Sequence, residues 1–320
     1  MTEQDLISAR QRRFRTAGNS ITTIEDARAF MNDVSFCLMY PLRHAFAAPL
    51  ATFIGAFVGS ADALPFAHIA FADPRTKDAT ELMVRMLREK SAFESNFFEE
   101  SPLLISSEMF PYFYALVADK TPRIAPKTTG HYKVSRLAVD VYAAIEKHGP
   151  LTKSQLHGEY LARGGSITDA GLDRALNELW AILKITRVDH SPEEGARWGL
   201  LAQWAPDLVR RGAQMSAPEA TSAIISRYLA GVIAAEEGEI EEFVGRFASR
   251  SRVLEILKML IAAREIEQVS MPGTRGLLKM ADVAPAAVWS SPAPAERRPK
   301  PQSRKTHNRL QEAVPRKKHG

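Results

Sequence analysis

The side chains able to do chemistry are scattered along this sequence rather than gathered in a known catalytic motif. It contains no glycine-rich phosphate loop, no His/Cys zinc spacing, no Gly-x-Ser-x-Gly elbow and no His-Glu-x-x-His helix. The histidines fall in different predicted elements, where each is more often a surface or capping residue than a ligand; they include His44, His68, His131, His148, His157 and His190. We therefore predict no bound metal and no cofactor.

Positive charge, in contrast, is concentrated at the C-terminal end. Residues 296–320 hold nine Lys and Arg against two Glu, a net charge of +7, so a whole-chain charge of +5 leaves −2 on residues 1–295. A Pro/Ala/Ser-rich linker precedes this segment, and the apolar content is too low for a core, so we expect a disordered basic tail over 283–320. Such an arm binds phosphates without reading bases, with an affinity that falls steeply with salt. The alternative is a tail that only keeps the protein soluble.

A second group of cations lies on a predicted helix that begins at Ser249. Arg250, Arg252 and Lys258 lie on this helix, and Arg275 lies in the following turn. Arginine and lysine are suited to phosphates and base edges, although charged first turns are also ordinary on solvated helices. The residues predicted to contact DNA are Arg246, Arg250, Arg252, Lys258, Arg275, Arg297, Arg298, Lys300, Arg304, Lys305, Arg316, Lys317 and Lys318.

These side chains require a scaffold, and residues 134–280 repeat one pattern twice: three helices followed by a short strand hairpin. This order is the outline of a winged-helix unit, although helical bundles also alternate helices and hairpins. The first copy, 130–205, has a capping box at Thr152 and Gln155 and a turn at 191–195. The second copy, 216–282, has Ser249 as the cap of its third helix and a turn at 271–276.

The third helix of the first copy carries acidic residues that distinguish it from the second copy. Asp169, Asp173 and Glu178 lie on this helix, and Glu193 and Glu194 lie in the turn of the hairpin. These carboxylates would repel phosphate, so we expect this helix to pack against a neighbouring part of the protein.

Residues 21–125 fit a degenerate third copy. Thr23 caps a helix through Met31, 49–58 and 77–89 fit two more, a hairpin runs over 92–105, and an aromatic helix covers 108–116. The apolar run 35–41 interrupts this pattern and fits either a buried strand or part of a helix. Four aromatic residues of the last helix have faces suited to stacking on a base, but core packing is the favoured interpretation; they are Phe110, Tyr112, Phe113 and Tyr114.

The predicted fold class is therefore α+β and mostly helical, with tandem winged-helix units, short β-hairpins and a disordered basic tail. The chain has 320 residues, 45% of them hydrophobic, which suffices for a sizeable core. It has no apolar run long enough to span a membrane, no secretory signal, and a single cysteine, so we expect a soluble cytoplasmic protein, nucleoid-associated if it binds DNA. Cys37 lies between Phe36 and Leu38, which predicts an inert buried thiol. The sequence leaves the oligomeric state open.

Several stretches resemble one family. The segment 82–90, leading into 104–116, is similar to AlkZ-related bacterial proteins, whose parent group is the AlkZ/YcaQ-like winged-helix DNA glycosylases; 149–152 and 173–179 also resemble that group. The resemblance covers roughly 21–280. It implies tandem winged-helix units around duplex DNA and a role in DNA repair, in which active members excise alkylated or crosslinked bases.

The catalytic motif of that family does not carry over. Active members have a Gln-x-Gln or Gln-x-Asp motif after the first helices, a polar pair suited to positioning water and to stabilising a cationic sugar. The corresponding stretch here, 34–41, is almost entirely apolar. Asp33 and Tyr40 are the nearest candidate catalytic groups, but a helix-ending acid and a packed tyrosine are the favoured interpretations.

Three functions follow from these patterns. The first is a noncatalytic DNA-binding protein related to these glycosylases, which holds duplex DNA through the second copy and the tail. The second is an active glycosylase with atypical catalytic residues. The third, favoured by the negative body and the acidic first copy, is a protein-interaction module that has lost DNA binding.

Overall fold

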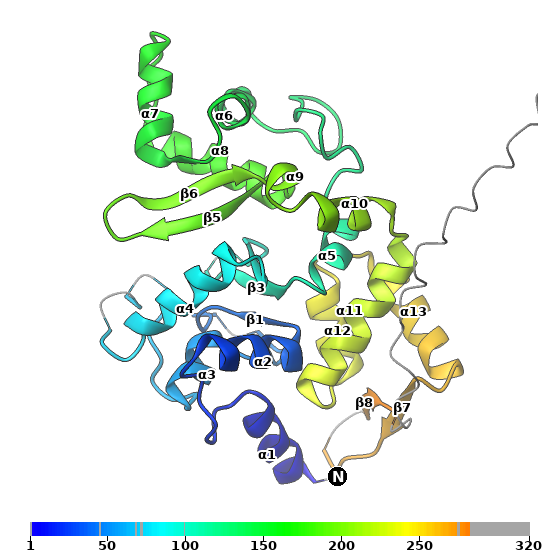
Figure 1. Ribbon diagram of the computed structural model, residues 1–320. Helices are drawn as coiled ribbons and strands as arrows, with labels where there is room; N and C mark the ends of the chain where they lie inside the picture. Colours follow the sequence, from blue (N-terminus) through cyan, green and yellow to red (C-terminus); the bar gives the residue numbers. More distant parts are fainter. Residues whose placement is uncertain are drawn as a thin grey trace, which may run out of the picture. The chain divides into compact units, whose positions relative to one another are not determined.

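The computed structural model arranges short helices and strands in an order that recurs along the chain (Figure 1). The structure describes residues 2–44, 46–67, 69–70, 73–98, 100–273 and 276–281. Three segments share one order of elements. We name them the N-terminal unit (24–106), the central unit (136–200) and the C-terminal unit (217–280).

The central unit has the three helices and the hairpin that the sequence predicts. Its elements are α6 (Arg136–His148), β4 (Leu151–Thr152), α7 (Lys153–Ala162), α8 (Asp169–Ala181), β5 (Ile185–Ser191) and β6 (Gly195–Leu200). The capping box at the start of α7 is confirmed, because Gln155 N donates to Thr152 Oγ1 (3.3 Å) and Thr152 N donates to Gln155 Oε1 (3.0 Å). The strands form an antiparallel sheet in the order β4-β6-β5.

The C-terminal unit repeats this arrangement. Its elements are α11 (Ala217–Val232), α12 (Glu237–Val244), α13 (Arg250–Ala262), β7 (Ile266–Val269) and β8 (Leu277–Met280). Ala235 pairs with Leu278 of β8, in the place that β4 occupies in the central unit. Ser249 occupies the cap position of α13, but its side chain makes no capping hydrogen bond and instead lies 3.2 Å from Ser251 Oγ.

The N-terminal unit follows the same order of elements. It contains α2 (Ile24–Val34), β1 (Phe36–Leu38), α3 (Phe53–Val58), α4 (Lys77–Arg88), β2 (Ala92–Ser95) and β3 (Leu103–Ser106), with the sheet order β1-β3-β2. The apolar run after α2 is thus a strand, and it corresponds to β4. Helix α3 is shorter than the predicted 49–58, because the Leu38 amide donates to Ala51 O (2.9 Å) and Thr52 caps the helix.

Among the described residues, three helices were not predicted, and a fourth lies within two residues of its predicted bounds. The unpredicted helices are α1 (Glu3–Arg13), α9 (Leu201–Trp204) and α10 (Pro206–Gln214), whereas α5 (Phe110–Val117) fits the aromatic helix. Helix α1 packs on the C-terminal unit, where Arg10 donates to Val232 O (3.0 Å) and Ala234 O (2.6 Å). Arg10 therefore donates hydrogen bonds to carbonyl groups at the end of α11, where the helix itself supplies no donor.

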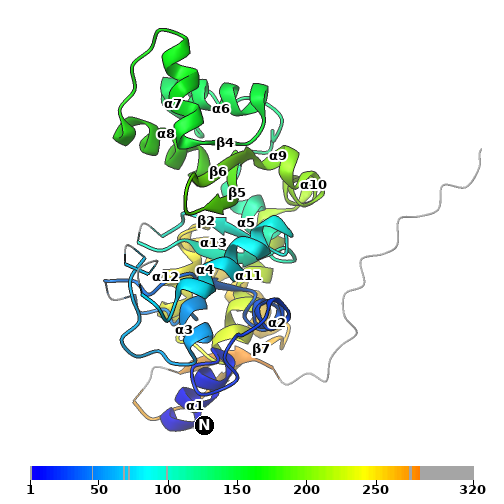
Figure 2. The same cartoon turned by 60° about the vertical axis from the view of Figure 1, so that its left-hand side comes forward.

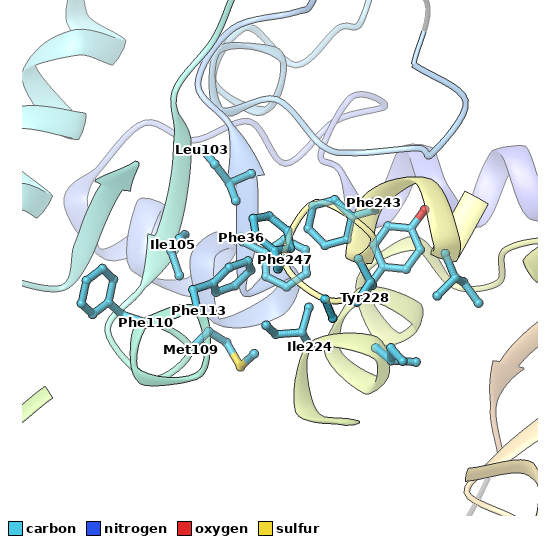
Figure 3. Packing of buried hydrophobic residues seen from close by; sticks show 14 of the residues in the cluster. Phe36, Leu103, Ile105, Met109, Phe110, Phe113, Ile224, Tyr228, Phe243 and Phe247 are labelled. Atoms are coloured by element: carbon cyan, nitrogen blue, oxygen red, sulfur yellow. The ribbon is translucent and has the colours of Figure 1, made fainter. Parts of the chain in front are cut away.

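One hydrophobic cluster joins the N-terminal unit, α5 and the C-terminal unit (Figure 3). The Phe36 ring of β1 stacks on Phe243 of α12, with centroids 5.1 Å apart, and contacts Phe113 of α5 edge-on at 5.4 Å. Phe110, Phe113 and Tyr114 are buried, which confirms the core interpretation of that helix. The central unit has a cluster of its own around Leu176, Trp180 and Trp198.

Candidate functional site

A cavity of about 690 Å³ lies where the central unit meets the N-terminal unit. Figure 2 shows β5 beside β2 at this junction, and α4 also contacts β5. Both aromatic and charged residues line the cavity, including Met39, Tyr40, Thr80, Glu94, Asn96, Phe98, Glu100, Asn177, Trp180, Arg187, Asp189 and His190.

The most buried charged group of this lining is Glu94 of β2, whose side chain is only 5% exposed. Arg187 of β5 pairs with it, with Nη1 3.2 Å from Glu94 Oε2. The guanidinium also lies over the rings of Trp180 (4.6 Å) and Trp198 (5.2 Å), and Trp180 Nε1 donates to Glu94 O at 3.1 Å. The two aromatic rings and the carboxylate together offset the free-energy cost of removing the Arg187 guanidinium from water.

Three polar atoms of the lining have no hydrogen-bond partner among the described residues. They are Thr80 Oγ1, Asn96 Oδ1 and Arg187 Nε, and all three are buried. The Asn96 amide nitrogen is used, because it donates to Asn177 O across the junction at 3.3 Å. The lining therefore presents an amide oxygen that can accept, a guanidinium N–H that can donate and a hydroxyl group that can do either.

The two candidate catalytic residues are not brought together. Tyr40 lines the cavity and is 4% exposed, and burial raises the pKa of its hydroxyl to about 12, so it stays neutral at neutral pH. Asp33 is the second-last residue of α2; it pairs with Arg15 (3.5 Å), and its carbonyl accepts from Arg13. Its position is that of the helix-ending acid favoured by the sequence.

Residues 36–39, within the apolar stretch 34–41, are buried and pack alternately into two hydrophobic clusters. Phe36 and Leu38 belong to the cluster shared with the C-terminal unit, whereas Cys37 and Met39 belong to the core of the N-terminal unit. Cys37 is fully buried, as predicted, and burial raises the pKa of its thiol. Of the residues in this stretch, Met39 and Tyr40 are the ones that line the cavity.

The predicted DNA-contacting cations of the C-terminal unit have different surroundings. Arg250 is largely exposed but pairs with Glu241 of α12 at 2.8 Å. Arg252 is half-buried and Lys258 is exposed. Arg246 is exposed, and its guanidinium lies 4.3 Å from the centroid of the Phe98 ring in the cavity wall. The predictions for Arg275, Arg297, Arg298, Lys300, Arg304, Lys305, Arg316, Lys317 and Lys318 lie outside the described residues.

Helix α8, the acidic helix of the central unit, contacts the N-terminal unit as the sequence predicts, because Trp180 Nε1 donates to Glu94 O (3.1 Å) and Asn96 Nδ2 donates to Asn177 O (3.3 Å), but its acids do not make these contacts. Asp173 of α8 pairs with Lys153 at 2.7 Å, and Glu178 accepts from Ser135 N at 2.6 Å, so both acids are held within the unit. Beyond the unit, Asp189 of β5 pairs with Arg88 of α4 at 2.6 Å. The central unit is thus joined to the N-terminal unit by ion pairs and hydrogen bonds as well as by packing.

Sequence reasoning did not find Glu94, Asn96 or Arg187. A usable signal was present, because Glu94 lies inside the apolar strand Ala92–Ser95 and an acid in such a strand requires a partner. The partner lies 93 positions away on β5, a separation that local patterns do not reveal.

Two further features can be stated for the part of the chain that the structure describes. It contains no group of three or more His, Cys, Asp or Glu arranged to hold a metal ion. Its helices are all too short or too polar to cross a lipid bilayer.

The described residues thus form a mixed α/β protein of small helical units, each with an antiparallel sheet or hairpin, with a partly polar cavity between the N-terminal and central units. The family model described as DNA glycosylase AlkZ-like matches residues 67–305, and the chain belongs to this family. The fold is similar to that of the Streptomyces sahachiroi DNA glycosylase AlkZ, with a TM-score of 0.54 and 13% identity over 88% of this chain and 70% of that one. No curated protein matches the sequence.

Proposed function

We propose that this chain is a DNA-binding protein related to DNA repair, which holds duplex DNA without excising bases by the usual family motif. The observation that carries the second half of this proposal is the burial of β1 and of Met39, the residue that follows it. Cys37 is 0% exposed and Met39 is 5% exposed, and neither side chain can position water or stabilise a cationic sugar as a Gln-x-Gln pair would.

Binding is supported by the C-terminal unit. We interpret the three units as winged-helix units, with α13 as the helix that faces DNA. Arg250 lies at its start, and Lys258, two turns further on, is exposed to solvent. Because Glu241 holds the Arg250 guanidinium, a phosphate must compete with this carboxylate, so we expect modest affinity from the folded body and a large share from the basic tail.

A mobility-shift titration on a fully paired duplex tests the binding. The full chain is compared with a chain that lacks residues 285–320, at several salt concentrations. We expect the truncated chain to bind more weakly and with a smaller salt dependence, because fewer counterions are released. Equal affinity and equal slopes would show that the tail takes no part, and no shift of the full chain would refute DNA binding.

A second candidate function, base excision by atypical groups, is favoured by one observation. Glu94 places a carboxylate at the cavity beside Tyr40, and a carboxylate can stabilise a cationic sugar. Its ion pair with Arg187 offsets this charge, which is why binding alone is the better-supported function. If any excision is measured, Glu94→Gln tests whether the Glu94 carboxylate takes part in it. Activity that survives this substitution does not arise from Glu94.

A further inference from the structure

A second cavity, of about 440 Å³, is lined by α9, α10 and the connection 118–135 that leads from α5 to α6. Helix α10 packs on α5 (Figure 1), and the two cavities have no lining residue in common. Part of the wall is apolar, because Val209 of α10 is buried and Ala202 and Ala213 are half-buried. The volume lies within the range of roughly 300–1,000 Å³ that is common for ligand sites.

A tight turn over residues 121–124 forms one wall of this cavity. The Ile124 amide donates to Thr121 O (3.1 Å), which closes the turn. The buried Lys184, whose side chain is 3% exposed, holds the same turn, because its Nζ donates to Thr121 O (2.8 Å) and Ile124 O (2.9 Å). The turn therefore presents the Arg123 and Ile124 side chains on a backbone that is held in place.

The charged side chains of this lining are all cationic. Among the described residues they are Lys120, Arg123 and Arg210, and no carboxylate lines the cavity. Lys120 Nζ donates to three backbone carbonyls of α5 and of the C-terminal end of α10, so its hydrogens are already used. Arg210 pairs with Asp207 at 2.7 Å, whereas Arg123 is exposed and has no ion-pair partner in the part of the chain that the structure describes. Arg123 is therefore the cation best placed to receive an anionic group.

Apolar groups lie beside this arginine. The Ile124 side chain is 53% exposed, and Pro122 and Pro206 also line the cavity. A DNA phosphate would contact the arginine but leave these apolar groups uncovered, because phosphate contacts are polar. A protein segment that combines acidic residues with a bulky apolar residue would use both features, since protein interfaces bury an apolar centre and match opposite charges around it.

We propose that this cavity binds an acidic segment of a partner protein. One bulky apolar side chain of that segment lies against Val209 and Ala213, and a neighbouring carboxylate pairs with Arg123. This site goes beyond the proposed DNA binding, because it includes neither α13 nor any cation predicted to contact DNA. Because Lys184 already holds the turn, little backbone entropy is lost when the segment binds.

Fluorescence anisotropy with the full chain and labelled peptides tests this site. Each peptide has four glutamates followed by a C-terminal phenylalanine, leucine or serine. Residues 296–320 carry a net charge of +7 and attract every acidic peptide, so the serine-ended peptide measures this background. We expect the phenylalanine-ended or the leucine-ended peptide to bind about tenfold more tightly than the serine-ended one, because only an apolar side chain gains from burial in the cavity. Equal binding of the three peptides, or no binding of any, overturns the proposal.

Two substitutions in the turn locate the binding. Ile124→Ser should remove the preference for an apolar end, and Arg123→Glu should weaken binding of the preferred peptide about fivefold. Both side chains are exposed, so we expect unchanged melting temperatures. Leu161→Ser and Arg163→Glu are the matched controls, because both residues are exposed at the C-terminal end of α7 and neither lines the cavity. Effects of the turn variants no larger than those of their controls overturn the proposal.

Mobility shifts with a fully paired duplex separate this site from the proposed function. We expect Arg123→Glu to change duplex binding no more than Arg163→Glu does. If Arg123→Glu weakens duplex binding more, and the peptides show no preference for an apolar end, the cavity contacts the DNA backbone and the proposal is overturned. Absence of all duplex binding refutes the proposed function, whereas the peptide measurements need no DNA and still decide whether this site exists.

Discussion

Replacement of Arg187 by leucine should destabilise the protein, because it leaves Glu94 buried without its partner. Removal of one member of a fully buried pair costs about 3–5 kcal/mol. The Glu94 side chain is 5% exposed but that of Arg187 is 31% exposed, so water already screens part of the interaction. We therefore expect Arg187→Leu to lower the free energy of unfolding by about 2–3 kcal/mol.

Urea denaturation of four proteins measures this effect: the parent, Arg187→Leu, Glu94→Leu and the double variant. Because the two residues are in contact, the double variant should lose less stability than the two single losses combined, with a coupling of about 1–3 kcal/mol. Arg210→Leu is the control, because Arg210 pairs with Asp207 on an exposed helix surface. Additive single losses, or an Arg187→Leu loss no larger than that of Arg210→Leu, would refute the importance of the buried pair.

Three further predictions follow from single sites. Combined Arg250→Ala and Arg252→Ala should weaken duplex binding by the chain without residues 285–320 and leave its melting temperature unchanged, because the Arg250 side chain is 78% exposed; a large drop in melting temperature would show a structural role. Cys37 should react with a thiol reagent at pH 8 only after denaturation, since it is 0% exposed and its pKa is raised; rapid labelling of the native protein would contradict this. Burial raises the pKa of Tyr40 from 10 to about 12, so the contribution of its neutral hydroxyl to stability is present below pH 10 and lost between pH 10 and 12. Tyr40→Phe should therefore make the free energy of unfolding less dependent on pH over that window. An unchanged pH dependence would contradict this prediction.

The secondary structure could be predicted where local patterns define it. Thr23 and Thr152 are capping residues in the structure, and the apolar spacing of the central and C-terminal units gave their helices and hairpins. The strand β1 could not be distinguished from a helix by periodicity, because all three of its residues are buried. Its strand conformation depends on pairing with β3, for example Phe36 with Ile105, which is nonlocal.

The candidate site could be predicted only in part. Tyr40 was singled out by its place in the apolar stretch, and it does line the cavity. The other half of the site depends on the docking of two units, because Arg187 on β5 meets Glu94 on β2 across 93 positions of sequence. Helix α1 was missed although a local signal was present, because Thr2 and Asp5 form a capping box at its start.

Binding without base excision is the central claim, and one measurement tests it most directly. The full chain, in excess over a duplex that carries a methylated guanine, is incubated until a mobility shift shows that all the DNA is bound. The sample is then treated with alkali to cleave any abasic site. We predict complete complex formation and no strand breaks above a buffer control. Lesion-dependent breaks in the bound sample, lost when Glu94, Tyr40 or Asp33 is substituted, would contradict the account and show that the protein is an active glycosylase.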